Sequence, residues 1–297
     1  MVQQKGFFSN IGRGTIYLIV LLLGLICLLP MLNILAISFS GNAAVAANKV
    51  GFLPVDFTMA AYEKILSDQQ FWRSFGISVI RVVLGLVINL VLIVLMAYPL
   101  SKSKREFKGR NIYMNLLIFA MLFSGGMIPT YLVVKNLGLL NTVWALILPG
   151  AVPIFSVIMV MNFFIGVPKS LEEAAVIDGA TPMQVLTRVY LPCSKPVIAT
   201  IALFSIVGNW NDFFSGLIYM TKVNNYPLQT YIQSLSVKLE DMLKAGGSVS
   251  SIDNMLDVSA QNLNAAKIIV SVIPLLLIYP LLQKYLITGI VVGSVKE

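Results

Sequence analysis

The chain has 297 residues and a formal net charge of +8, with 58% hydrophobic and only 11% charged residues. Soluble domains carry about a quarter charged residues, so this composition excludes an ordinary soluble protein and predicts an integral membrane protein. The absence of histidine, with only two cysteines, removes the commonest general base and the commonest transition-metal ligand, so we expect no metal site.

In chain order, the apolar runs predict an all-α fold with six membrane-spanning helices, since a span needs roughly 20 apolar residues. The expected spans are 15–39, 72–100, 111–135, 139–166, 196–220 and 266–289. We treat residues 1–297 as a single transmembrane domain whose core covers about 72–290.

Lysine and arginine residues predict the orientation, because they concentrate in cytoplasmic loops. With the N-terminus inside, more of them fall on the inner side, and the loop SKSKREFKGR (101–110) contributes most. Both termini and residues 167–195 are then cytoplasmic. The outer segments 40–71 and 221–265 are long; the first contains the amphipathic AAYEKIL, and the second a short helix that we expect to end at Gly246–Gly247.

Residues 168–192, PKSLEEAAVIDGATPMQVLTRVYLP, interrupt the apolar runs with a compact helical hairpin. Ser170 and Glu173 have the spacing of a capping box for a first helix over about 171–178. Gly179 is placed to end that helix in the left-handed conformation. Thr181 caps a second helix, Pro182 occupies its first turn, and Pro192 stops it after Tyr190.

The hairpin has two interpretations from its residues alone. Its apolar faces and the small Ala174 and Ala175 would suit docking into a groove of a partner protein. Alternatively, it is a re-entrant or interfacial hairpin that only closes the loop.

Polar residues inside spans usually face protein or a wet cavity. The densest cluster is GNWNDFF (208–214), and the candidate substrate path comprises Asn89, Asn209, Trp210, Asn211 and Asp212. Trp210 would offer a stacking face to a sugar ring; the alternative is interhelical hydrogen bonding with an interfacial aromatic. Arg81 is the embedded cation that could meet an acidic sugar, or it snorkels outward.

Glu173-Ala174-Ala175, Gly179, Val189 and Leu191-Pro192 resemble the signature loop of ABC importer permeases, with every spacing matched. Val189 stands where that motif has isoleucine, a change that keeps shape and chemistry. Other segments are similar to the carbohydrate-uptake branch: FWRSFGISVIRVV (71–83), AYPLSKSKREFKGR (97–110), GLLNTVWALILPG (138–150) and GNWNDFF. The segment 124–142 resembles a subgroup for complex oligosaccharides, including those from acidic polysaccharides.

The resemblance implies a permease subunit of a binding-protein-dependent importer of oligosaccharides in a bacterial cytoplasmic membrane. It implies a second homologous permease, two copies of an ABC ATPase that hold ATP and Mg²⁺, and an extracellular binding protein. This chain itself would bind no cofactor and catalyse no reaction; it lacks a GxxxxGK[ST] phosphate loop. The implied ATPase-coupling residues are Glu172, Glu173, Ala174, Ala175, Asp178, Gly179, Ala180, Leu191 and Pro192.

Other functions remain open at this point. An amino-acid or peptide permease of the ABC class would share the hairpin. Ion-coupled transporters often contain inverted repeats, and we find no internal repeat in this sequence, which argues against that alternative. The net positive charge does not predict a nucleic-acid partner. In a membrane protein the positions of the basic residues are more informative than their total, and here they indicate the orientation of the chain.

Overall fold

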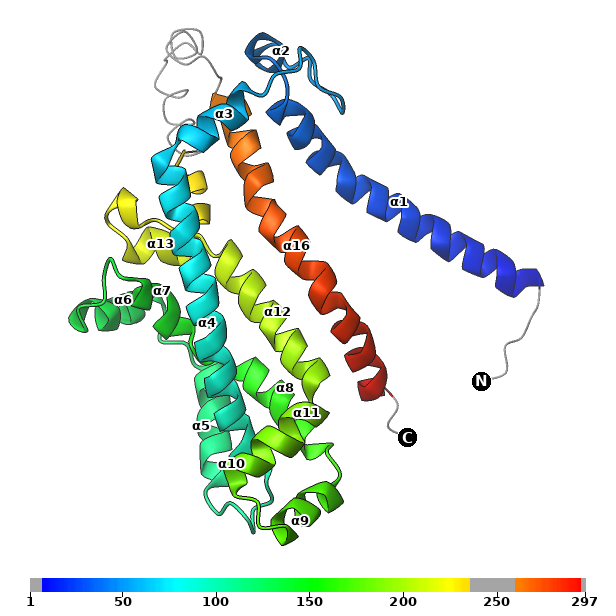
Figure 1. Cartoon of the computed structure of the whole chain (residues 1–297), viewed down its shortest axis with the longest axis vertical. Coiled ribbons are helices and arrows are strands. Elements are labelled where there is room, and N and C mark those ends of the chain that lie inside the picture. The colour runs from blue at the N-terminus through cyan, green and yellow to red at the C-terminus, as the bar shows by residue number, and fades with distance from the viewer. Residues whose placement is uncertain (1–6, 236–259, 295–297) are drawn as a thin grey trace. The chain divides into compact units, whose positions relative to one another are not determined.

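The structure is a computed structural model, and it describes residues 7–235 and 260–294. Within these ranges the chain forms helices joined by loops, without strands (Figure 1). Three helices are long and apolar enough to cross a membrane, and three bent helix pairs raise the number of candidate spans to 6. The predicted all-α membrane fold is therefore confirmed.

The helices have the following bounds: α1 Phe7–Ser38, α2 Asn42–Ala46, α3 Ala60–Ser67, α4 Gln69–Ser101, α5 Arg110–Leu122, α6 Met127–Asn136, α7 Val143–Ile147, α8 Ile154–Ile165, α9 Lys169–Ile177, α10 Pro182–Val185, α11 Leu191–Cys193, α12 Lys195–Asn211, α13 Phe214–Tyr219 and α16 Ala260–Ser294. Short 3-10 turns, η1 and η3, lie at Leu148–Gly150 and Val223–Asn225, and one π-helical turn, η2, at Leu186–Tyr190.

The chain divides into two compact units. The first comprises residues up to Gln69 together with 234–272, and the second comprises Gln70–Gln233 together with the residues from Ile273 on. In the first unit, Lys267 at the start of α16 pairs with Asp68 at 2.7 Å. Asn262 donates to the Ser40 carbonyl, so the segment 40–68 is tied to α16 by buried polar contacts.

The amphipathic AAYEKIL is helical as predicted and forms most of α3. Residues 228–235 also form the start of a helix, but the predicted stop at Gly246–Gly247 lies outside the described residues.

The third predicted span, 111–135, is not one continuous helix. α5 and α6 meet at an angle of 113°. Between them, Gly126 has φ 86° and ψ 174°, a backbone conformation that is almost restricted to glycine. The apolar run thus contains a sharp turn that hydropathy could not predict, because hydropathy depends on composition and not on backbone direction.

Two further apolar runs are also bent. The helical segments Val143–Gly150 and Ile154–Ile165 meet at 52°, at a site that contains Pro149 and Pro153. In the fifth run, α12 ends at Asn211 and α13 begins at Phe214. The segment Pro182–Cys193 lies at 85° to α12. The breaks near Pro149 and Pro153 and at Asp212 border a cavity described below.

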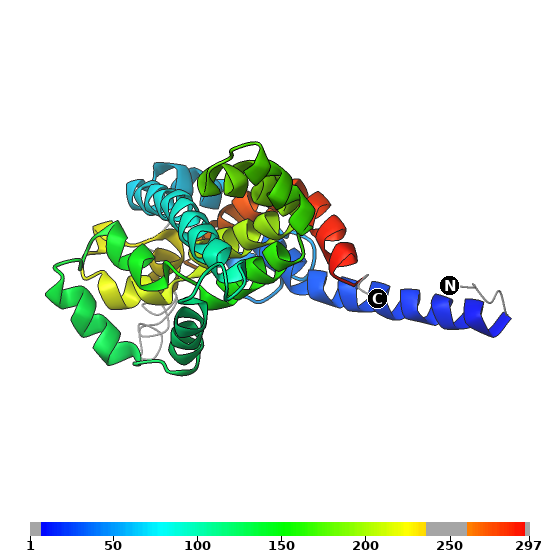
Figure 2. The ribbon, with the colours of Figure 1, turned by 90° about the horizontal axis from the view of Figure 1, so that it is seen from below.

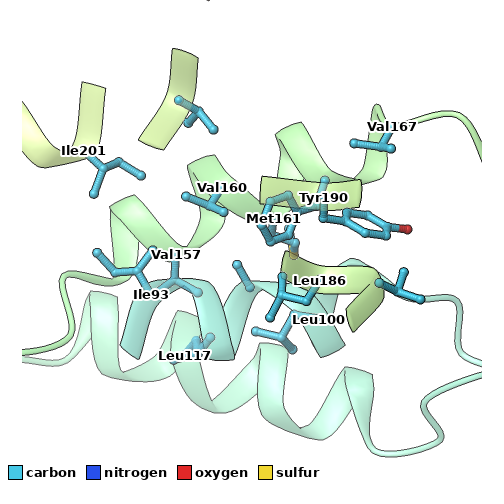
Figure 3. Close-up of a cluster of buried hydrophobic side chains, with 14 residues drawn as sticks. Ile93, Leu100, Leu117, Val157, Val160, Met161, Val167, Leu186, Tyr190 and Ile201 are labelled. Atoms are coloured by element: carbon cyan, nitrogen blue, oxygen red, sulfur yellow. The ribbon is translucent and has the colours of Figure 1, made fainter. Parts of the chain in front are cut away.

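The core of the second unit joins the spans to the 168–192 hairpin (Figure 3). Its buried side chains come from α4, α5, α8 and α12, and from Val185, Leu186 and Tyr190 of the hairpin. In Figure 1, α9 lies at the lower end of this unit, so it lies on the viewer's side in Figure 2. The hairpin is therefore packed into the membrane unit and is not a loose loop.

Candidate functional site

The first half of the hairpin ends as the sequence predicts. Gly179 has φ +77°, the left-handed region that glycine enters without steric cost. The Ala180 N–H donates to the Ala175 carbonyl at 2.9 Å, and the Gly179 N–H donates to the Val176 carbonyl at 3.0 Å. This pair of hydrogen bonds is a Schellman motif, and it fixes the direction in which the chain leaves α9.

The start of the second helix is also confirmed. The Gln184 N–H donates to the Thr181 hydroxyl at 3.4 Å, and the Thr181 N–H donates to the Gln184 side chain at 2.8 Å. Pro182 lies in the first turn. The predicted end after Tyr190 is too early by three residues. A π turn leads directly into α11, which ends at Cys193 and holds Pro192 in its first turn, where proline is tolerated.

The predicted capping box of Ser170 and Glu173 does not form. α9 begins at Lys169, with Pro168 at the N-cap and no side-chain capping bond. The fixed φ of Pro168, −57°, suits a helix start, so Ser170 already lies inside the first turn.

One side of the hairpin is exposed and largely apolar. Leu171 is 45% exposed, Val176 57%, Ile177 85% and Met183 56%. We call these four residues, with the exposed Glu173, Ala174, Asp178 and Gly179, the hairpin face. Ala175, Ala180 and Leu191 instead pack against the buried core, and Pro192 is exposed beyond them. Five of the nine predicted coupling residues thus lie outside the face: Glu172, Ala175, Ala180, Leu191 and Pro192.

Glu172 points away from the hairpin face. Its carboxylate pairs with Lys102, which directly follows α4, at 2.5 Å. It also accepts a hydrogen bond from the Tyr190 hydroxyl at 2.5 Å. Glu172 and Glu173, both predicted to couple to the ATPase, therefore point in different directions, because successive helical residues lie about 100° apart around the axis.

A second candidate site is a cavity of about 270 Å³ in the second unit, with a lining that is partly polar and partly apolar. Three predicted path residues line it: Asn89, Asn209 and Asp212. Further polar lining comes from Arg81, Ser156, Ser205, Ser215 and Tyr219. Asn209 donates to the Ser205 carbonyl at 2.9 Å, one helical turn away, so its amide is held in place.

Arg81 connects the continuous helix α4 to two broken runs around this cavity. Its side chain is 3% exposed and pairs with Asp212, which follows α12. It also donates to the backbone carbonyls of Asp212, at 2.8 Å, and Leu146, at 3.4 Å. Ser215 completes the carboxylate shell through its N–H at 3.1 Å and its hydroxyl. Arg81 therefore does not snorkel outward, and its charge is compensated inside the protein.

Two predicted path residues do not line the cavity. Trp210 is only 4% exposed and packs edge-on against Phe75, with ring centroids 5.6 Å apart. Its ring thus has no free face for a sugar in this conformation. Asn211 is exposed and is not among the lining residues.

Sequence reasoning missed several of the residues that matter here. Ser205 lies four residues before Asn209 and so on the same helical face, a spacing that could have identified it. No local pattern identifies Lys102 or Tyr190, because their partner Glu172 is distant in the sequence. Lys102 is 70 residues from Glu172, and Tyr190 is 18 residues from it. Among the described residues, no cluster of acidic or cysteine side chains could hold a metal ion.

Comparison with known proteins matches residues 89–292 to the family model described as "Binding-protein-dependent transport system inner membrane component". Protein LplC of Bacillus subtilis (strain 168) is 46% identical over 273 residues, which cover 92% of this chain and 90% of that protein. The polygalacturonan/rhamnogalacturonan transport system permease protein YtcP of the same organism is 40% identical, covering 95% of this chain and 96% of that protein.

A solved structure has the same fold. It is a chain of a bacterial ABC transporter involved in the import of the acidic polysaccharide alginate, with a TM-score of 0.84 and 32% identity. The similarity covers 96% of this chain and 99% of that chain. The family model covers more than half of the chain and includes the hairpin. The chain therefore belongs to the family of inner-membrane components of binding-protein-dependent transport systems.

Proposed function

We propose that this chain is one of two membrane subunits of an ATP-driven importer of oligosaccharides. The observation that carries the proposal is the hairpin face, an exposed surface joined to the buried core of a chain whose family serves binding-protein-dependent transport. Such a surface suits docking into a groove of a separate ATPase. The relatives YtcP and the alginate importer support polymer-derived sugars as the substrate class.

The chemistry of the cavity is compatible with this substrate class. Asn89, Asn209 and Ser205 offer amide and hydroxyl groups that exchange hydrogen bonds with sugar hydroxyls. Arg81 and Asp212 neutralise each other. We propose that Asn89, Asn209 and Asp212 border the substrate path, while Trp210 and Asn211 support the surrounding structure.

The proposed assembly contains this chain, a second homologous permease, two copies of an ABC ATPase and an extracellular binding protein. The ATPases hold ATP and Mg²⁺. The complex lies in a bacterial cytoplasmic membrane, with both termini and the hairpin inside, as the basic loop 101–110 favours. ATP binds the closed ATPase pair better than the open one, and this difference biases the spans towards the outward-open state.

Purification of the tagged chain from its native membrane in mild detergent, followed by mass spectrometry, tests the assembly. We expect a second permease and an ATPase to co-purify. The complex, reconstituted with its binding protein, should accumulate oligosaccharides derived from polygalacturonan, rhamnogalacturonan or alginate only when ATP is present.

Two outcomes would contradict the proposal in different ways. A chain that purifies alone and transports without ATP would be a secondary transporter. A complex that transports amino acids or peptides but no oligosaccharide would refute the substrate class and keep the importer architecture.

A further inference from the structure

α9 carries most of the hairpin face, yet none of the α9 residues is buried. Apolar burial fixes the orientation of most surface helices, and here it contributes little, because only the half-buried Ala175 of α9 packs against the core. Contacts other than apolar burial must therefore fix the orientation of α9 when a partner protein binds to it.

Contacts among the side chains of Lys102, Glu172 and Tyr190 can fix this orientation. Lys102 donates to the Glu172 carboxylate at 2.5 Å and to the Tyr190 hydroxyl at 3.1 Å. The Tyr190 hydroxyl donates to the other oxygen of Glu172 at 2.5 Å. The three groups thus form a closed triangle in which each polar group has a partner, and such networks are stiffer than isolated pairs.

The triangle rests on the core of the second unit. The Lys102 ammonium lies 4.4 Å from the ring centres of both Tyr98 and Tyr190, a distance suited to cation–π attraction. The Tyr190 ring in turn packs edge-on against Phe164 of α8 at 5.3 Å. The side chains of Lys102 and Glu172 are only 13% and 22% exposed, so water screens their attraction less than at an open surface.

The loop that carries Lys102 is itself ordered. The Ser103 N–H donates to the Glu106 carboxylate at 2.7 Å, and this hydrogen bond lowers the pKa of Glu106 below its usual value. Arg110 closes the loop by donating to the Leu100 carbonyl at 2.9 Å. Lys102 is therefore held at the end of α4 from both sides.

From this geometry we propose that Lys102, Glu172 and Tyr190 form a strut that fixes α9 to the end of α4 and transmits hairpin movement to the spans. This inference rests on the proposed function and adds to it the means by which hairpin movement reaches the spans. Glu173 and the rest of the hairpin face contact the ATPase, whereas Glu172 is a positioning residue that acts inside the permease. Without the strut, α9 would turn about Gly179 when the ATPases close, and the spans would follow only in part.

The test measures transmission without needing to know the sugar. Cys27 and Cys193 are replaced by serine, and Ser205→Cys places one thiol in the cavity. The readout is the change in its labelling rate by a small methanethiosulfonate reagent when ATP binds to the whole complex. We expect Lys102→Gln and Glu172→Gln each to reduce this change by about tenfold, as coupled networks of this kind allow.

Three further variants separate the strut from simple packing. The charge swap Lys102→Glu with Glu172→Lys should restore much of the ATP-driven change. Tyr190→Phe keeps the ring and should have an intermediate effect. Lys104→Gln, which removes an exposed charge from the same loop, should have none. In all of them the ATPase should co-purify as in the unsubstituted complex.

A reversible cross-link provides an independent readout where a variant folds poorly. Lys102→Cys and Glu172→Cys, joined by a short bis-methanethiosulfonate linker, should support the ATP-driven change, which should weaken when the linker is reduced.

Several results would overturn the strut. These are an unchanged labelling response in both single variants, loss of ATPase binding in Glu172→Gln, a swap no better than the singles, or a cross-link that blocks the response. If the unsubstituted complex shows no ATP-driven change, the proposed importer cycle itself fails, which is a distinguishable result.

Discussion

Gly179 is the residue whose conformation most directly fixes the hairpin. A Cβ built at this position meets no atom within 4 Å, so any cost of substitution comes from its φ of +77° alone. We therefore expect Gly179→Asn to be mildest, Gly179→Ala to cost about 1 kcal/mol of hairpin stability, and Gly179→Val to cost more. Co-purification of the ATPase, measured as a function of temperature, checks the order. Equal effects for all three would contradict a backbone origin.

The Arg81–Asp212 pair predicts an asymmetric response to substitution. Arg81 is almost fully buried, so removing the carboxylate with Asp212→Leu leaves an unpaired buried cation, at a cost of about 3–5 kcal/mol. Arg81→Met leaves an anion that keeps its bonds to Ser215 and some exposure, so it should cost less. The double variant should be more stable than Asp212→Leu alone. Thermal unfolding in detergent measures all three, and strict additivity would contradict direct pairing.

At the residue scale, local signals predict the end of the first hairpin helix and the start of the second, but not the start of α9, where Pro168 and not Ser170 is the N-cap. Gly179, Thr181 and Pro182 could be assigned correctly because each acts on its own turn of the backbone. The roles of Glu172 and Glu173 could not be separated in this way. Which carboxylate points inward depends on Lys102 and Tyr190, and only the folded chain brings them together.

At the scale of elements, hydropathy located the apolar runs but not their bends. Residues 111–135 form one predominantly apolar run, yet Gly126 turns the chain through a conformation that hydropathy does not record. The prediction from hydropathy therefore counted this run as one span. The polar cavity lies beside other such breaks, so its full lining could not be predicted from the spans alone.

The close approach of α4 and α12 gives an element-scale prediction. A Cβ at Gly85 would lie 2.9 Å from the Asn209 amide nitrogen, so Gly85→Ala must displace the amide that borders the cavity. We expect weaker oligosaccharide uptake, seen mainly as a higher KM, with little loss of stability because alanine favours the helix by up to about 1 kcal/mol. Uptake by reconstituted complexes measures the effect.

Gly76→Ala is the matched control for Gly85→Ala. It lies on the same helix, and an added Cβ meets nothing within 4 Å. Uptake should remain unchanged or the protein should become slightly more stable. Equal uptake by the two variants would show that the position of Asn209 does not matter for the substrate path.

At the scale of the whole molecule, the exposed surfaces show where the chain is incomplete by itself. Many α1 side chains are more than 40% exposed and apolar, as expected of a helix against lipid or another subunit. The hairpin face is exposed as well, but it combines apolar residues with Glu173 and Asp178. An acidic, partly apolar surface favours a protein partner with basic groups over a lipid surface, whose headgroups are neutral or anionic.

Glu173→Lys tests that contact across the assembly. Glu173 is exposed, so the folded permease should tolerate the reversal, whereas a basic groove on the ATPase should repel it. We expect ATPase co-purification and ATP-driven uptake to fall together by about tenfold or more, which is the range for truncated or reversed interfacial charges. Glu63→Lys reverses an exposed charge on α3 and should leave ATPase association unchanged. Normal uptake in Glu173→Lys would remove this carboxylate from the interface, and the apolar residues Val176, Ile177 and Met183 would then have to hold the ATPase without it.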